Sequence, residues 1–489
     1  MEITPVDSTS GGVDTFGADL GVGILLPGDA ERIAESIRGF SVREVGSSAW
    51  MRQHEALEKA NLQAHANARG NRDPFVMEAM LTFDKMTVLI HELMAVEAWR
   101  EFVFPLLRSG GAVERNGLRL YYTFYHEATL VNLLEVFLYH DYACEAAGDA
   151  LIDLVDYCCR KVSWLVMRGA TPAEAKKSRE EIVAEMRGDG DGDGDGGAKS
   201  VAARDMEARL NDIEYRCAVT AVSLLRYITE HIAKLPLGVM GRVLDTHDVM
   251  IMMVPLIENP PWTRRTPEGT WQKFDEQKWS DVAPVDLLRL TKTEGQVWLI
   301  LYNLMCDKDC RAKYYFHSSR KGAIMRLRKY MNELLLDQLP PLAEVQRYLD
   351  ELAIMETPAP TAVGGAMSAA GLVLEAVPVL RDTLLRDQDW DDVAEFQLRE
   401  SFPSGGDAAD DDLRRLAAMY SDDGVADIMD PAGRRAMAAA EAAAEAEAAA
   451  ASGGSGGGAG GAKKKNKGMK GKKGRGGPRE GGAEEKKEA

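Results

Sequence analysis

The stretch MTVLIHELMAVEAWREFVF, residues 86–104, decides the fold class. Its apolar residues recur every three or four positions, a spacing that lines one face of an α-helix. This face carries Leu89, Leu93, Val96, Trp99 and Val103. The pattern therefore predicts an all-α chain. The same spacing recurs in the stretches 130–138, 151–165, 219–235, 283–306 and 321–336.

Strand-like alternation is nearly absent, and its one plausible location is the stretch near 270–280. The chain has 489 residues, whereas a single hydrophobic core stops growing at about 250–300 residues. Closely spaced helices that each have an apolar face to bury are typical of armadillo- or HEAT-type arrays. We therefore expect an extended helical repeat array, with a compact irregular helical fold as the alternative.

Composition divides the chain into segments. Runs of Gly and Asp, or of Pro, Ala and Gly, interrupt helices, and tracts of Gly and Lys bury nothing. The expected segments are a disordered N-terminus (1–23), a helical-repeat scaffold (24–356) with a flexible Asp/Gly insert (188–197), a linker (357–371), a C-terminal helical segment (372–430), and a low-complexity Ala/Glu helix with a disordered, basic Gly-, Ala- and Lys-rich tail (431–489).

Charge is unevenly distributed. The formal net charge is −18, and the stretch from Lys463 onward has eleven Lys or Arg against four Glu, so it carries +7 and the rest carries −25. An acidic body repels phosphate, so we expect no specific nucleic-acid binding by it. The basic tail is either a solvated tail or an attachment to acidic proteins, tubulin tails or RNA through charge alone.

The cysteines and the apolar runs indicate a compartment. Six cysteines in a chain of this length, set within helical apolar patterns, are typical of reduced core thiols rather than of a disulfide framework. The N-terminus shows no signal peptide, and no run approaches the roughly 18 apolar residues of a membrane span. We expect a cytoplasmic protein without a membrane span.

Motifs for chemistry are incomplete. His54, His91 and His126 each precede Glu, but none has the second His of an H-E-x-x-H zinc helix, so ordinary polar helix positions are the better interpretation. The Asp/Gly insert imitates a calcium loop but has Ser200 where the bidentate Glu would stand. Cys306 and Cys310 lack further ligands nearby. We expect no catalytic residue, no metal and no cofactor.

The segment 259–284 is broken by Pro and Gly and is expected to be a Trp-rich loop. Trp and Arg are the residue types that contribute most to interface energies, so this loop is a candidate partner-docking site. The alternative is that the tryptophans only hold the loop against the helices. The candidate residues are Trp262, Arg264, Arg265, Trp271 and Trp279.

Several long stretches, in register over roughly residues 24–400, match one known family. These stretches are LLPGDAE (25–31), VREVGSSAWMRQHEALEKANLQA (42–64), LIHELMAVEAWR (89–100), VFPLL (103–107), YHEATLVNLLE (125–135), LVDYCCRK (154–161), LLRYIT (224–229), PWTRR (261–265), WSDVAP (279–284), GQVWLILYNL (295–304) and LLDQLP (335–340). They resemble the family of the MYND-type zinc finger ciliary dynein arm assembly factor.

The resemblance implies a non-catalytic cytoplasmic factor, a co-chaperone-like adaptor needed for the preassembly and stability of axonemal dynein arms in motile cilia. It implies as partners a leucine-rich-repeat dynein assembly factor, heat-shock chaperones and co-chaperones, with dynein intermediate and heavy chains as clients. It also implies residence in cytoplasmic dynein assembly foci or near the ciliary base.

One departure from the family is large. The family ends in a MYND finger with Cys and His ligands, whereas this sequence has no Cys after Cys310 and no His after His317. We therefore expect a member that lacks the finger and binds no zinc. Two rival functions stay open: a trafficking or microtubule-associated scaffold acting through the basic tail, and a metalloenzyme.

Overall fold

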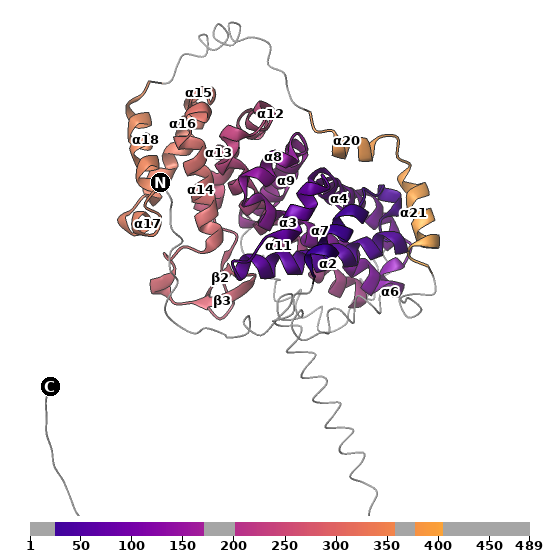
Figure 1. The fold of residues 1–489 in the computed structure, drawn as a ribbon. Helices are drawn as coiled ribbons and strands as arrows, with labels where there is room; N and C mark the ends of the chain where they lie inside the picture. The colour runs from indigo at the N-terminus through magenta and orange to yellow at the C-terminus, as the bar shows by residue number, and fades with distance from the viewer. Residues whose placement is uncertain (1–24, 171–200, 357–376, 404–489) are drawn as a thin grey trace, which may run out of the picture. The chain divides into compact units, whose positions relative to one another are not determined.

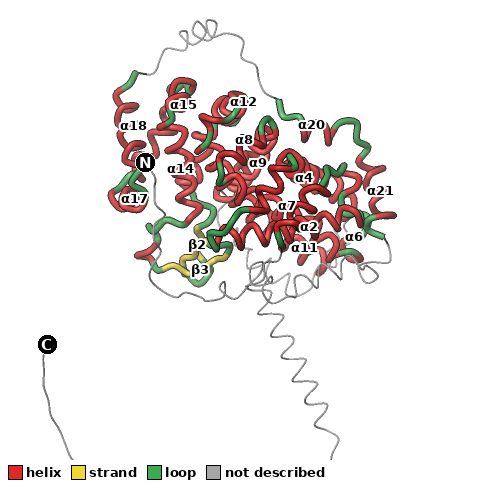
Figure 2. Tube along the Cα trace, viewed as in Figure 1, coloured by secondary structure: helices red, strands yellow, loops and turns green. Residues whose placement is uncertain are grey.

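The computed structural model describes residues 25–170, 201–356 and 377–403, which all belong to one compact unit, Met1–Val425 (Figure 1). This part of the chain is mostly helical, which confirms the predicted fold class, and it contains one small sheet (Figure 2). The predicted disordered N-terminus, the insert 188–197, the linker 357–371 and the segment 431–489 lie outside the described residues.

The quoted stretch forms helix α4 (Met86–Ala98), which continues into a π-helical turn (Trp99–Val103) before α5 (Phe104–Ser109). Pro105 directly follows the π-helical turn, so its missing N–H removes one hydrogen bond from this helical run. The five residues of the predicted apolar face are buried. The other helices that precede residue 171 are α1 (Pro27–Ser36), α2 (Ser48–Arg69), α3 (Phe75–Thr82), α6 (Ala112–Arg115), α7 (Gly117–Leu138), α8 (Asp141–Ala147) and α9 (Ala150–Ala170).

Helices also dominate after residue 200, but the periodic stretches 283–306 and 321–336 are not continuous helices. In the first stretch a 3-10 turn at Pro284–Asp286 precedes the helix, which begins only at Lys292, and in the second a 3-10 turn at Arg326–Tyr330 separates two helices. The helices are α11 (Val201–Glu230), α12 (Leu237–Gly241), α13 (Val249–Glu258), α14 (Lys292–Cys306), α15 (Lys308–Lys313), α16 (Ser318–Met325), α17 (Glu333–Gln338), α18 (Leu342–Ile354), α20 (Leu380–Leu385) and α21 (Trp390–Glu400).

The middle of helix α7 is buried on all sides. Residues 126–131 are six consecutive buried residues, more than one full helical turn. A helical turn without an exposed side belongs to the interior of a fold. Helices α2, α4 and α11 pack around it, α9 and α14 pack against α11, and α18 packs against α14.

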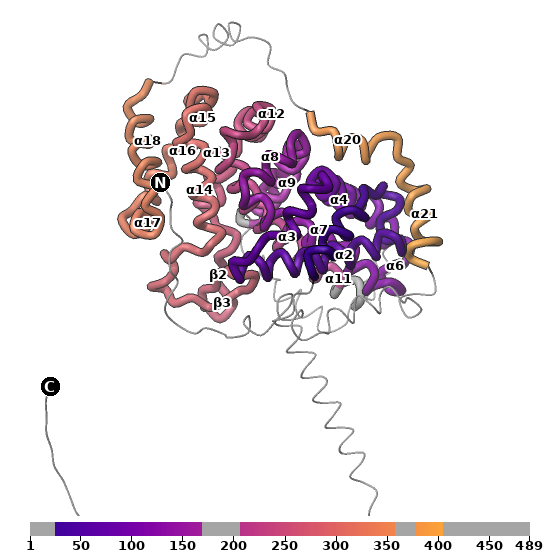
Figure 3. The backbone as a smooth tube through the Cα atoms, in the orientation of Figure 1, coloured from indigo at the N-terminus to yellow at the C-terminus, as the bar shows by residue number. Residues whose placement is uncertain are grey.

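The segment 377–403 returns to the N-terminal helices (Figure 3). The buried Gln397 of α21 accepts a hydrogen bond from the Trp99 indole at 2.7 Å and donates to the carbonyl of Val42 at 2.9 Å. The Phe402 ring lies where a Cβ on Gly46 would stand, and Gly46 has a φ of +80°, so only glycine fits there. Nothing in the sequence pattern indicated that this segment completes the N-terminal core.

The cysteines are free, and Cys144, Cys158, Cys159, Cys217 and Cys310 are buried, while Cys306 is half-buried. Burial raises the pKa of the Cys217 thiol to about 12, so it stays protonated. The predicted core position is confirmed for the five buried cysteines.

Ordinary polar helix positions were expected at the three His-Glu dipeptides, and for two of them this expectation is wrong. His54 of α2 and His126 of α7 are fully buried, and their Nδ1 atoms lie 3.0 Å apart. They are held in the core by ring contacts with Trp50, whose centroid is 4.4 Å from that of His126. Burial lowers the pKa of His54 to about 3, and burial together with His54 lowers that of His126 well below its ordinary value.

This pair predicts a loss of stability in mild acid. Below about pH 6.5 both histidines are protonated in the unfolded chain but not in the folded protein. Each histidine therefore lowers the free energy of unfolding by up to about 1.4 kcal/mol for every pH unit of further acidification. Glu58 acts in the opposite sense, because burial raises its pKa to about 7 and the folded state holds its proton. We therefore expect a double variant, His54→Gln with His126→Gln, to lose less stability than the wild type between pH 7 and pH 5, by about 2–4 kcal/mol.

Urea unfolding at the two pH values measures this difference. Every other titrating group is common to both proteins, so the comparison isolates the histidines. An equal loss of unfolding free energy in the two proteins would contradict the assignment.

Candidate interaction site

The predicted Trp-rich loop is a three-stranded antiparallel sheet, so the loop prediction is wrong for its central part. The strands are β1 (Thr263–Arg265), β2 (Trp271–Asp275) and β3 (Lys278–Val282), in the order β1–β2–β3. Glu276 and Gln277 join β2 to β3 with φ values of 49° and 62°. This conformation matches a two-residue hairpin turn, although neither residue is the Asn or Gly that usually signals one. Without an Asn-Gly or Asp-Gly turn signal, the sequence indicates strands only near 270–280 and does not predict the hairpin.

Trp262 is part of the core and not of the surface. Its side chain is only 1% exposed, and it lines a cavity of about 180 Å³ together with Leu256 and Trp298. The indole Nε1 is buried and has no hydrogen-bond partner among the described residues. This tryptophan therefore holds the start of the sheet against the helices, as the alternative interpretation proposed.

The other four candidate residues form two cation–aromatic pairs. The guanidinium of Arg264 lies 4.0 Å from the Trp279 ring centroid, and that of Arg265 lies 5.7 Å from the Trp271 centroid. The two arginines are exposed, and the two tryptophans are half-buried. Such pairs contribute about 0.5–1 kcal/mol at exposed positions and orient the cation.

The two pairs lie on opposite faces of the sheet. Arg265 is directly opposite Trp271, and Arg264 is directly opposite Gln272. Because successive residues of a strand point to opposite faces, the Arg264–Trp279 pair and the Arg265–Trp271 pair cannot form one patch. The structure thus brings four of the predicted residues together as two Arg–Trp pairs, and it places the two pairs on opposite faces of the sheet.

Contacts with two helices fix the sheet in place. On one face, Phe274 and Trp279 pack against Tyr215 of α11, with centroid distances of 4.9 Å and 5.8 Å. On the other face the buried Lys273 forms an ion pair of 2.9 Å with Glu294, which also caps the N-terminus of α14 through Thr291. Both faces are anchored, so the sheet presents its arginines on a rigid support.

The site offers binding surface rather than reactive groups. The cavity beside Trp262 is smaller than the roughly 300 Å³ at which ligand pockets begin, and its charged side chains, Lys273 and Glu294, neutralise each other. Within the described ranges, no three His, Cys, Asp or Glu side chains come close enough to hold a metal ion. Of the helices that the structure describes, none has the length and apolar composition needed to cross a bilayer.

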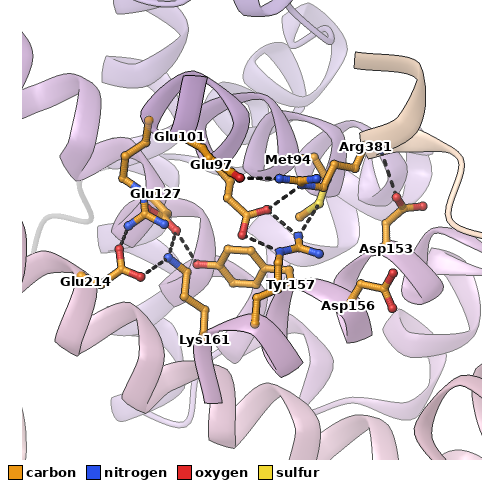
Figure 4. Close-up of polar contacts among 12 residues, drawn as sticks. Met94, Glu97, Glu101, Glu127, Asp153, Asp156, Tyr157, Lys161, Glu214 and Arg381 are labelled. Carbon is orange, nitrogen blue, oxygen red and sulfur yellow. Dashed lines mark hydrogen bonds and ion pairs between the residues drawn. The ribbon is translucent and has the colours of Figure 1, made fainter. Parts of the chain in front are cut away.

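Sequence reasoning missed a buried cluster of charges between α4, α7, α9 and α11 (Figure 4). Glu127 accepts hydrogen bonds from the Tyr157 hydroxyl at 2.8 Å and forms an ion pair of 2.5 Å with Lys161. Lys161 also contacts Glu214 at 2.8 Å, and Arg100 forms ion pairs with both glutamates. Burial alone would raise the pKa of Glu127, but Arg100 and Lys161 outweigh it and lower this pKa to about 2.

A second group of charges holds α20. Glu97 of α4 forms ion pairs with Arg160 at 2.5 Å and with Arg381 at 3.4 Å. The buried carboxylate of Asp153 accepts a hydrogen bond from the main-chain N–H of Arg381 at 3.0 Å (Figure 4). It accepts another from the main-chain N–H of Val379, also at 3.0 Å. The Arg–Glu pairing spans more than two hundred residues of sequence, and no local pattern indicates it.

We expect Glu127→Gln to lower the free energy of unfolding by about 3–5 kcal/mol. The substitution removes one of the two carboxylates that neutralise the buried Lys161 and Arg100. Glu101→Gln is the matched control, since Glu101 is half exposed where it pairs with Arg381, and its loss should cost about 1 kcal/mol or less. Urea unfolding followed by circular dichroism compares the two. Equal losses would show that the buried cluster is not essential to the core.

Comparison with known proteins identifies the family. The Zinc finger MYND domain-containing protein 10 homolog of Drosophila melanogaster is 32% identical to this chain over 369 residues, which cover 75% of each sequence. No family model and no solved structure matches the chain. The matched length is far greater than any single motif and agrees with the resemblance found in the sequence. This chain therefore belongs to the family of Zinc finger MYND domain-containing protein 10.

Proposed function

We propose that this protein is a non-catalytic cytoplasmic assembly factor for axonemal dynein arms, acting as a co-chaperone-like adaptor. The observation that carries the proposal is the 32% identity to the Drosophila melanogaster relative, over three quarters of both sequences. The resemblance of the matched stretches to ciliary dynein assembly factors supplies the process. The proposed partners are the leucine-rich-repeat dynein assembly factor, heat-shock chaperones and co-chaperones, and dynein intermediate and heavy chains as clients.

An adaptor of this kind needs broad surface rather than a deep pocket. In the described part, long helices contact one another in the series α2, α7, α11, α14 and α18. This series supports the finer proposal of an armadillo- or HEAT-like array, whose stacked helices offer extended faces to clients. Modest affinity spread over a wide surface lets a client be released after assembly.

The exposed arginines of β1 are the proposed docking residues. Arg264 bonds to Gln272 at 2.9 Å, and Arg265 bonds to the carbonyl of Gly269 at 3.0 Å, so both side chains are oriented before any partner arrives. Orientation before binding lowers the entropy cost of association. Each arginine also has an aromatic ring beneath it, an arrangement that suits a carboxylate-bearing partner.

We expect the double variant Arg264→Ala with Arg265→Ala to capture less leucine-rich-repeat assembly factor and less dynein intermediate chain, by about tenfold in affinity. Its thermal midpoint should stay close to that of the wild type, since both side chains are exposed. Co-precipitation with purified partners measures the loss. Lys292→Ala, which removes an exposed cation 3.4 Å from Glu276, is the matched control and should bind normally.

A second candidate function rests on the tail, in which eleven Lys or Arg follow residue 462. A trafficking or microtubule-associated scaffold acting through these charges would lose its function when residues 452–489 are deleted. We expect the opposite: in ciliated cells that lack the protein, a chain ending at residue 451 should restore dynein arms. Transverse sections of axonemes and the cytosolic level of dynein heavy chain are the readouts. Cells without the protein that keep intact arms would refute the proposal itself.

A further inference from the structure

Strand β3 lies at the free end of the sheet. The main-chain N–H of Phe274 donates to the Trp262 carbonyl at 2.8 Å, so the main chain of Phe274 faces away from β3. Trp279 is directly opposite Phe274. In an antiparallel pair, opposite residues exchange either both hydrogen bonds or neither. The N–H and C=O of Trp279 therefore point outward, away from β2.

The same holds two residues further along β3. Hydrogen-bonded and non-bonded pairs alternate, so the pair of Gln272 and Asp281 has the same character as that of Phe274 and Trp279. Outside the sheet, no residue that the structure describes hydrogen-bonds to the main chain of Trp279 or Asp281. The outer edge of β3 thus presents two N–H donors and two C=O acceptors in one row.

This edge is complementary to itself. If two copies of β3 pair antiparallel about Ser280, Trp279 of each copy faces Asp281 of the other, and the two pairs exchange four hydrogen bonds. All the outward groups are then used. Ser280 faces its own equivalent across the two-fold axis, and Lys278 faces Val282, so no like charges lie opposite one another.

Charge favours the same arrangement. Asp281, Gln272 and Arg264 share one face of the sheet, because Gln272 is directly opposite each of the other two. The Arg264 guanidinium lies over the Trp279 ring on that face, 4.0 Å from its centroid. Pairing about Ser280 brings the Asp281 carboxylate of the second copy alongside Trp279, within reach of this cation.

We propose that the protein forms a two-fold dimer in which the β3 strands of two copies join their sheets into one six-stranded sheet centred on Ser280. This inference goes beyond the proposed function and does not rest on it, since neither clients nor chaperones take part. Four hydrogen bonds and two ion pairs over a short edge make a weak dimer that forms and separates with concentration.

Disulfide cross-linking tests the register. The non-bonded pair at the axis has a Cα–Cα distance of about 4.5 Å, which suits a disulfide, so purified full-length Ser280→Cys should become a covalent dimer under mild oxidation. Lys278→Cys is the matched control, exposed on the same strand. Its two copies would lie roughly 13 Å apart in the dimer, and it should stay largely monomeric. Cross-linking of both variants, or of neither, overturns the proposal.

Sedimentation of the full chain over about 1–100 µM tests the association itself. The wild type should pass from monomer to dimer. Asp281→Pro should weaken the dimer about tenfold or more, because it removes two of the four hydrogen bonds and both ion pairs, while the only bond to β2 that it removes is that of its side chain with Gln272. Ser280→Lys sets two cations face to face and should have the same effect through an exposed side chain, whereas Ser280→Thr should not. A wild type that is monomeric throughout, or a dimer that persists in folded Ser280→Lys, overturns the proposal.

Discussion

The complete burial of residues 126–131, in the middle of α7, is the constraint on which the rest of the structure depends. A charged side chain in this turn must find its countercharge inside the protein, because an unpaired buried charge costs several kcal/mol. Glu127 therefore determines the identity of its neighbours: Tyr157 and Lys161 on α9, Arg100 on the π-helical turn, and Glu214 on α11 through Lys161. The countercharges of Glu127 come from the π-helical turn that follows α4 and from α9, which packs against α11.

The sequence predicted what depends on spacing. The apolar residues of 86–104 are buried as expected, since a stripe at helical spacing has to leave water wherever the helix lies. The same reasoning did not find the burial of His54 and His126, because a single His-Glu position does not reveal that another histidine from a distant helix meets it. The pairing of Arg381 with Glu97 was hidden for the same reason: the partners are far apart in sequence and close only in the fold.

The sequence named the residues of the candidate site, but it did not predict that Trp262 is buried in the core or how the other four residues are arranged on the sheet. Trp and Arg marked the segment correctly as unusual, but the alternation of side chains along β1 and β2 decides that Arg264 and Arg265 serve opposite faces. The sequence indicated strands only near 270–280, where β2 and most of β3 lie. The hairpin turn at Glu276 and Gln277 lacks the usual turn residues, so β1, the pairing of the strands and the free edge of β3 were not predicted. A rigid sheet on a helical body gives this protein two exposed cations in fixed positions, together with an edge available for pairing.

Hydrogen exchange in the native protein tests most directly the central claim, that the helices are organised around α7. Amides of residues 120–137 should exchange only through global unfolding and be the slowest in the described part, while amides of α20, a short helix tied down by Asp153, should exchange through local opening. Exchange of the α7 amides at the rate of those in α20, or faster, would contradict the account.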